Sequence, residues 1–137
     1  MTRWRWSLGI GATVLLVLAA YGPVLLAEVP AVCAAIYAGL GSICHQDPSR
    51  GFFVAGLPTA LCARCLGVCA GAVLGFLAPL RFSRKQLIGL LTLAVAVWLA
   101  EALAAGWPAE VRFLAGTPIG IALAAPLAEA SRRTVLC

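Results

Sequence analysis

Four runs of about twenty residues, almost free of charge, constrain this chain most strongly. They cover residues 7–27, 61–80, 86–106 and 113–130. Each run is close to the roughly 20 residues that cross a bilayer as a helix, and a helix satisfies its own backbone hydrogen bonds in lipid. Only 11% of the residues are charged, against about 25% in a soluble domain. The composition excludes an ordinary soluble enzyme or a nucleic-acid-binding protein. It predicts an all-α polytopic membrane protein whose main partner is the lipid bilayer.

The basic residues that flank the runs predict the orientation. With four spans, one side carries seven of them: Arg3, Arg5, Arg81, Arg84, Lys85, Arg132 and Arg133. The other side carries three, Arg50, Arg64 and Arg112. Because basic loops stay in the cytoplasm, we expect both termini to be cytoplasmic in an inner or plasma membrane. The first run is longer than the 7–15 apolar residues of a signal peptide, so we expect a retained anchor. Residues 1–137 then form a single transmembrane domain.

An outer segment of residues 28–60 connects the first two runs. Its apolar part, residues 30–43, is too short to span, which is typical of a re-entrant or interfacial helix. We therefore expect a short helix on the outer face, followed by a polar loop at residues 45–58.

Glycines at four-residue spacing predict how the helices pack. They are Gly67, Gly71 and Gly75 in the second run, and Gly116 and Gly120 in the fourth. Small residues at this spacing let helix backbones approach closely in lipid. We expect a compact four-helix bundle, with a homo-oligomer through the glycine-rich faces as the alternative.

Five of the six cysteines map to the predicted outer half: Cys33, Cys44, Cys62, Cys65 and Cys69. The sixth, Cys137, lies on the cytoplasmic side and is expected to be incidental. Cys62 and Cys65 form a Cys-x-x-Cys motif at the start of the second run, where a helix N-terminus and Arg64 favour the thiolate. Cys44 and His45 add a sulfur and an imidazole from the preceding loop.

A carboxylate is expected near this cluster. Glu101 lies about five residues from the outer end of the third run, roughly 8 Å deep at 1.5 Å per residue. Intramembrane ionisable residues are usually paired and functional, and Arg112 is the expected partner, followed by Arg64 or Arg50. The predicted outward site is thus Cys44, His45, Cys62 and Cys65, surrounded by Gln46, Arg50, Arg64, Glu101 and Arg112.

Several short motifs resemble one family. Cys44-His45-Gln46, Arg50-Gly51-Phe52 and Leu61-Cys62-Ala63-Arg64-Cys65-Leu66-Gly67 are similar to the motifs of a family of small prokaryotic membrane proteins that is catalogued as a domain of unknown function. A weaker similarity is an acid late in the third run and Arg-x-x-x-Gly at residues 112–116. The chain departs from the family pattern at Gly51, Cys69 and Glu101, where serine, an aromatic residue and aspartate are usual. The resemblance supports a functional site at these motifs, but it implies no activity, because the family has none assigned.

Three interpretations of the site remain open. In the favoured one, Cys44, His45, Cys62 and Cys65 bind zinc or copper, because thiolate and imidazole ligands suit both ions. In the second, the chain is a thiol-disulfide oxidoreductase that uses a quinone, with Cys62 as nucleophile, Cys65 as its partner and Cys44 as the exchanging thiol. Only the architecture of quinone-linked oxidoreductases supports this analogy. In the third, a disulfide from Cys44 to Cys62 or Cys65 staples the loop to the second run.

Overall fold

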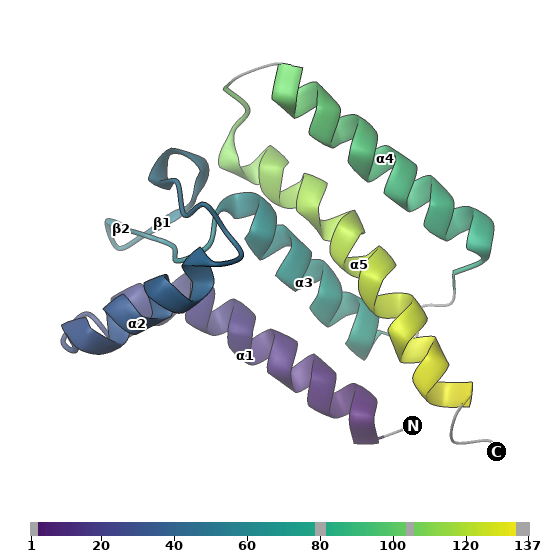
Figure 1. Cartoon of the computed structure of the whole chain (residues 1–137), viewed down its shortest axis with the longest axis horizontal. Coiled ribbons are helices and arrows are strands. Elements are labelled where there is room, and N and C mark those ends of the chain that lie inside the picture. The colour runs from purple at the N-terminus through teal and green to yellow at the C-terminus, as the bar shows by residue number, and fades with distance from the viewer. Residues whose placement is uncertain (1–2, 79–81, 104–105, 134–137) are drawn as a thin grey trace.

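The computed structural model describes residues 3–78, 82–103 and 106–133 and consists mainly of helices (Figure 1). Its α-helices are α1 (Arg3–Leu25), α2 (Pro30–Gly41), α3 (Ala63–Leu77), α4 (Arg84–Leu103) and α5 (Ala109–Arg133). A short 3₁₀ helix, η1 (Pro48–Arg50), and two strands, β1 (Phe53–Val54) and β2 (Leu57–Pro58), lie between α2 and α3. The expected all-α class therefore holds except for this small hairpin.

The helices α1, α3, α5 and α4 lie side by side in that order, and α2 projects from one end (Figure 1). The most extensive contact joins α3 to α5, while α1 packs on α3 and α4 on α5. Both α3 and α5 start at the end where α2 lies, and α1 and α4 run in the opposite direction. The first residue of α1 and the last of α5 consequently lie at the same end of the bundle.

Within the described residues, three helices are long and apolar enough to cross a membrane: Trp6–Leu25, Arg84–Leu103 and Ala109–Ala128. The fourth expected span, residues 61–80, is helical only over the 15 residues of α3, or about 22 Å at 1.5 Å per residue. A hydrocarbon core is about 30 Å thick. The helix ends early because Ala78 precedes Pro79 and adopts an extended conformation, with ψ at 145°, which is what a following proline favours. Residues 79–80 lie outside the described part of the chain.

The glycines of α3 and α5 bring these two backbones into direct contact, as the spacing predicts. A Cβ at Gly67 or Gly71 would lie 2.0 Å from the carbonyl oxygen of Phe113 or Thr117, respectively. The reciprocal contacts come from α5, where a Cβ at Gly116 would lie 2.2 Å from the carbonyl oxygen of Arg64. Contacts within one chain therefore occupy these glycine faces of α3 and α5.

The outer segment is more ordered than the expected polar loop. The expected short helix is α2, and Pro30 lies in its first turn. At this position the missing N–H of proline costs no hydrogen bond, because the first N–H groups of a helix have no partner within the helix. The hairpin that follows pairs Val54 with Leu57 across a two-residue turn. Both turn residues, Ala55 and Gly56, have positive φ, at 50° and 80°, as a type I′ turn requires. An alanine in this position gave no turn signal in the sequence.

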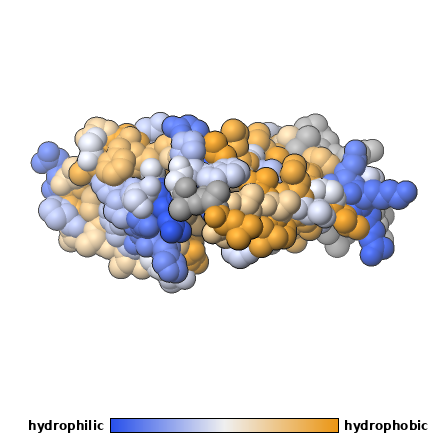
Figure 2. Space-filling view, turned by 90° about the horizontal axis from the view of Figure 1, so that it is seen from above, coloured by the Kyte–Doolittle hydropathy of each residue, from blue (hydrophilic) through white to orange (hydrophobic). Residues whose placement is uncertain are grey.

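The surface supports a membrane location. Figure 2 shows hydrophobic surface along the right-hand part of the molecule, between a hydrophilic band and a hydrophilic end. Large apolar side chains of α4 are exposed, including Ile88, Leu93 and Val95. Arg84 and Lys85 begin α4 at the end opposite to α2. The side chains of the other five basic residues in the predicted cytoplasmic group lie outside the described part of the chain. Cys137, which was predicted on the same side, lies outside it as well.

Candidate functional site

Three cysteines meet where the outer segment joins α3. Cys44 follows α2 and is buried, with its backbone N–H bonded to the carbonyl of Leu40 at 3.0 Å. Cys62 is the residue immediately before α3, and Cys65 lies in the first turn of that helix. Their three sulfur atoms all lie within 4.8 Å of one another. The backbone N–H of Cys62 also donates to the sulfur of Cys44 at 3.3 Å, which fixes the loop against the start of α3.

Hydrogen bonds to backbone carbonyl oxygens hold the loop in this position. The N–H of Ala60 donates to the carbonyl oxygen of Ala19 in α1 at 2.9 Å. The side-chain amide of Gln46 donates to the carbonyl oxygens of Tyr37 and Ala60, at 2.7 and 3.1 Å. The hydroxyl of Tyr37 donates to the carbonyl oxygen of Pro58 at 2.6 Å. Gln46, which the sequence predicts at the polar rim of the site, ties α2 to the segment that carries Cys62.

The sulfur cluster favours an ionised thiol. Cys62 precedes α3, and the Cys65 thiol donates a hydrogen bond to its sulfur. This hydrogen bond lowers the pKa of the Cys62 thiol to about 5, although burial acts in the opposite direction. Thiolates are both the nucleophiles and the metal ligands among cysteine forms. The five described cysteines are all free thiols.

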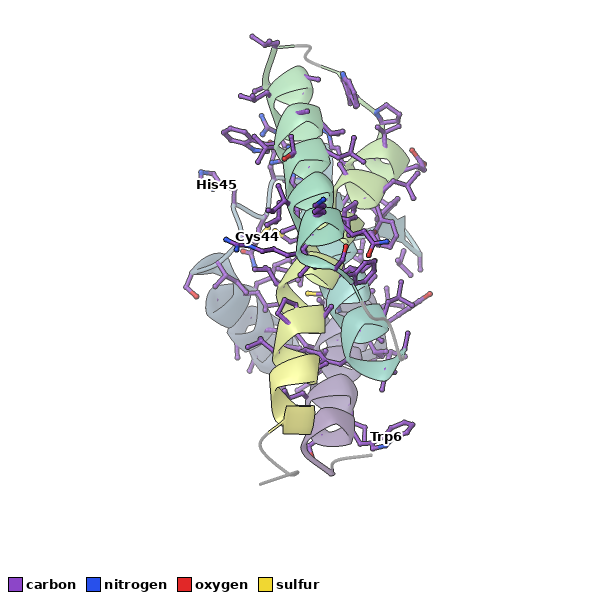
Figure 3. All side chains as sticks on the ribbon, turned by 90° about the vertical axis from the view of Figure 1, so that its right-hand side faces the viewer. Trp6, Cys44 and His45 are labelled. Carbon is purple, nitrogen blue, oxygen red and sulfur yellow. The ribbon has the colours of Figure 1, made fainter. Side chains whose placement is uncertain are left out.

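His45 does not join the sulfur cluster. Cys44 is buried, whereas His45 is exposed, and Figure 3 shows its side chain directed away from the helices. The group of potential ligand atoms in the described residues comprises the three cysteines without this imidazole. Adjacent residues in an extended segment point to opposite sides, so one ion is not expected to take both. His45 nevertheless lines the cavity beside the cluster.

The remaining described cysteines lie outside the group. The thiol of Cys33 donates to the carbonyl oxygens of Pro23 and Leu26, at 3.7 and 3.4 Å, at the end of α1. Cys69 lies one turn beyond Cys65 and packs against the apolar core around Leu61 and Leu66.

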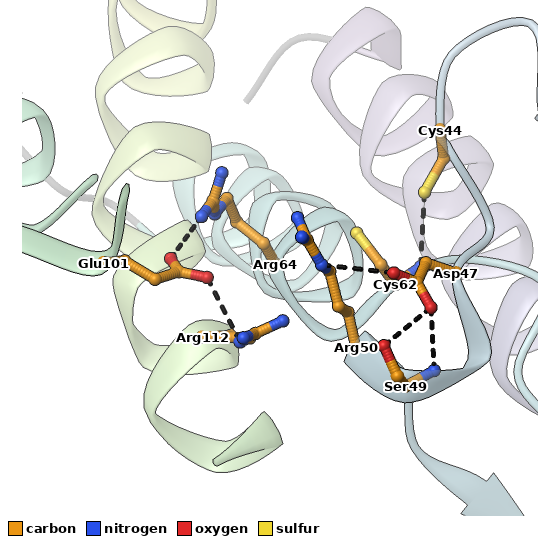
Figure 4. A network of polar contacts seen from close by, with 8 residues as sticks. All are labelled: Cys44, Asp47, Ser49, Arg50, Cys62, Arg64, Glu101 and Arg112. Carbon is orange, nitrogen blue, oxygen red and sulfur yellow. Dashed lines mark hydrogen bonds and ion pairs between the residues drawn. The ribbon is translucent and has the colours of Figure 1, made fainter. Parts of the chain in front are cut away.

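Glu101 forms the centre of a second polar group (Figure 4). Its side chain is only 6% exposed and pairs with Arg64, and it also pairs with Arg112, whose Nε lies 3.1 Å from Oε1. The expected partner Arg112 is thus present, and Arg64 is bound at the same time. Glu101 lies near the outer end of α4, two residues before Leu103, the last described residue of this helix. Because both oxygens of the Glu101 carboxylate are engaged in ion pairs, this side chain binds the two arginines and does not contact the sulfur cluster.

Arg50 has a different partner. Its Nε lies 3.2 Å from Oδ2 of Asp47, and the side chains of Arg50 and Asp47 are 63% and 41% exposed, respectively. The other oxygen of Asp47 accepts from the N–H and the hydroxyl of Ser49 at 3.0 and 2.7 Å. The hydroxyl contact with Ser49 lowers the pKa of the Asp47 carboxyl. Asp47 and Ser49 are not among the residues predicted for the site, although an aspartate before Pro-Ser is a recognisable turn signal.

The sulfur cluster and the charged group share one cavity of about 290 Å³. Its walls carry the three clustered cysteines, His45, Arg50, Arg64, Glu101 and Arg112, together with Ile43 and Asp47. The structure therefore brings together every residue of the expected site except Gln46. Close α3–α5 packing produces this convergence, because it places Arg64 beside the first turns of α5.

The comparisons identify a family. The model of the family described as "Predicted membrane protein (DUF2085)" matches residues 44–125, more than half of the chain. An uncharacterised protein of Methanocaldococcus jannaschii, MJ1492, is 45% identical over 42 residues, which are 31% of this chain and 27% of that protein. The match therefore spans about a quarter of the archaeal relative. No solved structure gives a significant match.

Proposed function

Because the chain belongs to the DUF2085 family of predicted membrane proteins, whose description gives no activity, we propose a function from the site itself: binding of one soft metal ion, zinc or copper(I). Cys44, Cys62 and Cys65 are the proposed ligands. The observation that carries the proposal is the convergence of their sulfur atoms within 4.8 Å of one another.

The spacing suits such an ion. A Zn–S bond is about 2.3 Å, so two sulfur ligands in a tetrahedral site lie about 3.8 Å apart. The three sulfur atoms need to approach by about 1 Å or less from their observed limit of 4.8 Å. Thiolates are the ligands that select copper(I) and zinc, and the low pKa of the Cys62 thiol supports one thiolate near neutral pH.

The ligand set is narrower than the one expected from sequence. His45 faces outward, and Glu101 is engaged by two arginines. Three protein ligands leave one coordination position of a tetrahedral ion open, as in catalytic zinc sites. The adjoining cavity of about 290 Å³ has room for a water molecule or a small ligand at that position.

We further propose that α3 is the fourth span, with its outer end at the sulfur cluster. Its 15 residues are flanked by Leu61, which is fully buried, and by the apolar residues after Leu77. A short span of this kind is tolerated when longer neighbours surround it, here α1 and α5. The excess of basic residues at the opposite end supports cytoplasmic termini in an inner or plasma membrane.

Elemental analysis of the detergent-purified full-length protein tests the metal proposal. We expect one equivalent of zinc or copper per chain, and its loss in Cys44→Ser, Cys62→Ser and Cys65→Ser. Cys69→Ser is the matched control, because Cys69 lies one turn away on the same helix and outside the cluster. This variant should keep the metal.

A thiol count and a disulfide map of the same samples separate the alternatives. Metal-free protein in which a Cys62–Cys65 disulfide is reduced and reformed with a quinone would overturn the proposal in favour of thiol-disulfide exchange. Metal-free protein with a permanent bridge from Cys44 would overturn it in favour of a structural staple. Equal metal content in all variants would also contradict it.

A further inference from the structure

The arginines beside the sulfur cluster carry more hydrogen-bond donors than their partner can accept. Arg64 and Arg112 both bind the carboxylate of Glu101. Each guanidinium has five N–H donors, and one carboxylate accepts at about four sites. Accordingly, Nε of Arg64 and both Nε and Nη1 of Arg112 are buried without a hydrogen-bond partner among the described residues. For Arg112, Nε lies close enough to Glu101 for an ion pair but not in hydrogen-bond geometry.

The charge at this position is not balanced. Two mostly buried arginines face one buried glutamate, whose side chain is 6% exposed against 12% for Arg112 and 29% for Arg64. A third arginine, Arg50, stands beside them, with an exposed carboxylate as its own partner. Buried charge without compensation is costly, so the group favours an additional anion.

A second cavity of about 580 Å³ opens onto the same side chains. Arg50, Arg64 and Arg112 line it together with Glu101, and Trp98 and Trp107 form part of its apolar wall. No sulfur atom of the described residues lines this cavity, whereas the 290 Å³ cavity contains the cysteine cluster. The two cavities thus meet at the arginines, with sulfur on one side only.

Helix direction adds to the positive potential. Arg64 is the second residue of α3, and Arg112 is the fourth residue of α5. Both helices begin at this end of the bundle (Figure 1). A helix N-terminus carries a partial positive charge and unpaired N–H groups that favour anions.

We propose that the 580 Å³ cavity binds a phosphate-type oxyanion between Arg50, Arg64 and Arg112. Arginine pairs with phosphate through two parallel N–H···O bonds, and the free guanidinium donors supply them. The anion is either a free phosphate or the phosphate of a phospholipid headgroup, since the cavity lies at the proposed outer membrane interface. Glu101 is a positioning residue that orients two of the arginines. This site does not depend on metal at the cysteines.

Two probes distinguish the sources. Inorganic phosphate is titrated into the detergent-purified protein by calorimetry. In parallel, native mass spectrometry compares retention of phosphatidylglycerol with that of a galactosyl diacylglycerol, which has similar tails but no phosphate. Binding of inorganic phosphate identifies the free ion as a ligand, and preferential retention of phosphatidylglycerol alone identifies the headgroup.

The variants are chosen to keep the fold. Arg50→Gln removes an exposed side chain that does not contact Glu101, and we expect binding to weaken roughly tenfold, as the loss of a charged hydrogen bond implies. Arg112→Gln should weaken it further. Arg84→Gln is the matched control, because Arg84 is exposed at the opposite end of α4. Cys65→Ser should bind the probe normally even where it loses metal.

Two outcomes would overturn the proposal. One is that the wild-type protein binds neither inorganic phosphate nor phosphatidylglycerol in preference to the galactolipid. The other is that Arg50→Gln and Arg84→Gln reduce binding equally, which would indicate attraction to overall charge. Neither result bears on the metal content of the cysteine cluster, so the two proposals fail separately.

Discussion

Replacement of Gly71 by alanine should push α3 and α5 apart. The new Cβ would lie 2.0 Å from the carbonyl oxygen of Thr117, whereas ordinary contacts begin at 3.4 Å. The helices must therefore separate by about 1.4 Å, and a backbone oxygen cannot move away by a side-chain rotation. Overpacking of this kind costs about 1–3 kcal/mol, and alanine returns up to about 1 kcal/mol of helix propensity. We expect a net loss of about 1–2 kcal/mol in the free energy of unfolding.

The assay is SDS-induced unfolding in mixed micelles, followed by tryptophan fluorescence. Gly89→Ala is the matched control, because Gly89 lies in α4 and its new Cβ would meet no described atom within 4 Å apart from its chain neighbours and the adjacent backbone of its own helix. This variant should be as stable as the wild type or slightly more stable. An unchanged unfolding midpoint for Gly71→Ala, or an equal loss in both variants, would refute the argument that glycine contacts set the α3–α5 distance.

Three further predictions concern the site and its supports. Glu101→Gln should lower the free energy of unfolding by about 3 kcal/mol in the same assay, because it leaves buried arginines without a countercharge, whereas the exposed Asp47→Asn should have a much smaller effect. In metal-free protein, Cys62 should react with iodoacetamide half-maximally near pH 5, and mass spectrometry showing a midpoint near the free-cysteine value of about 8.5 would disprove its low pKa. Gln46→Ala should speed trypsin cleavage after Arg50, since two hydrogen bonds that hold the loop are lost, and unchanged digestion would contradict this role.

Hydropathy predicted most of the helices because long apolar runs have few alternatives in lipid. In the second run the described helix stops at Leu77, which hydropathy does not register, because Ala78 is drawn into an extended conformation by the proline that follows it. The hairpin of β1 and β2 escaped prediction for a related reason. Its two-residue turn begins with Ala55, and alanine rarely adopts a positive φ, so no local signal marked it.

The sequence was sufficient to predict where the side chains of the site converge. It was not sufficient to predict which of them are placed to bind a metal ion. The Cys-x-x-Cys spacing and the burial cost of Glu101 indicated where side chains converge. The loop conformation decides which side chains point toward the cluster. Adjacent residues of the extended loop point to opposite sides, so Cys44 is buried and the imidazole of His45 is exposed. The role of Gln46 depends on carbonyl groups distant in sequence, which no motif reveals.

X-ray absorption at the metal edge tests the central claim most directly, because it reports the atoms bound to the ion. For protein loaded with one equivalent of zinc, we predict three sulfur scatterers at about 2.3 Å, reduced to two in Cys44→Ser. A first shell of nitrogen and oxygen alone, or an unchanged sulfur number in that variant, would contradict a metal centre built from Cys44, Cys62 and Cys65.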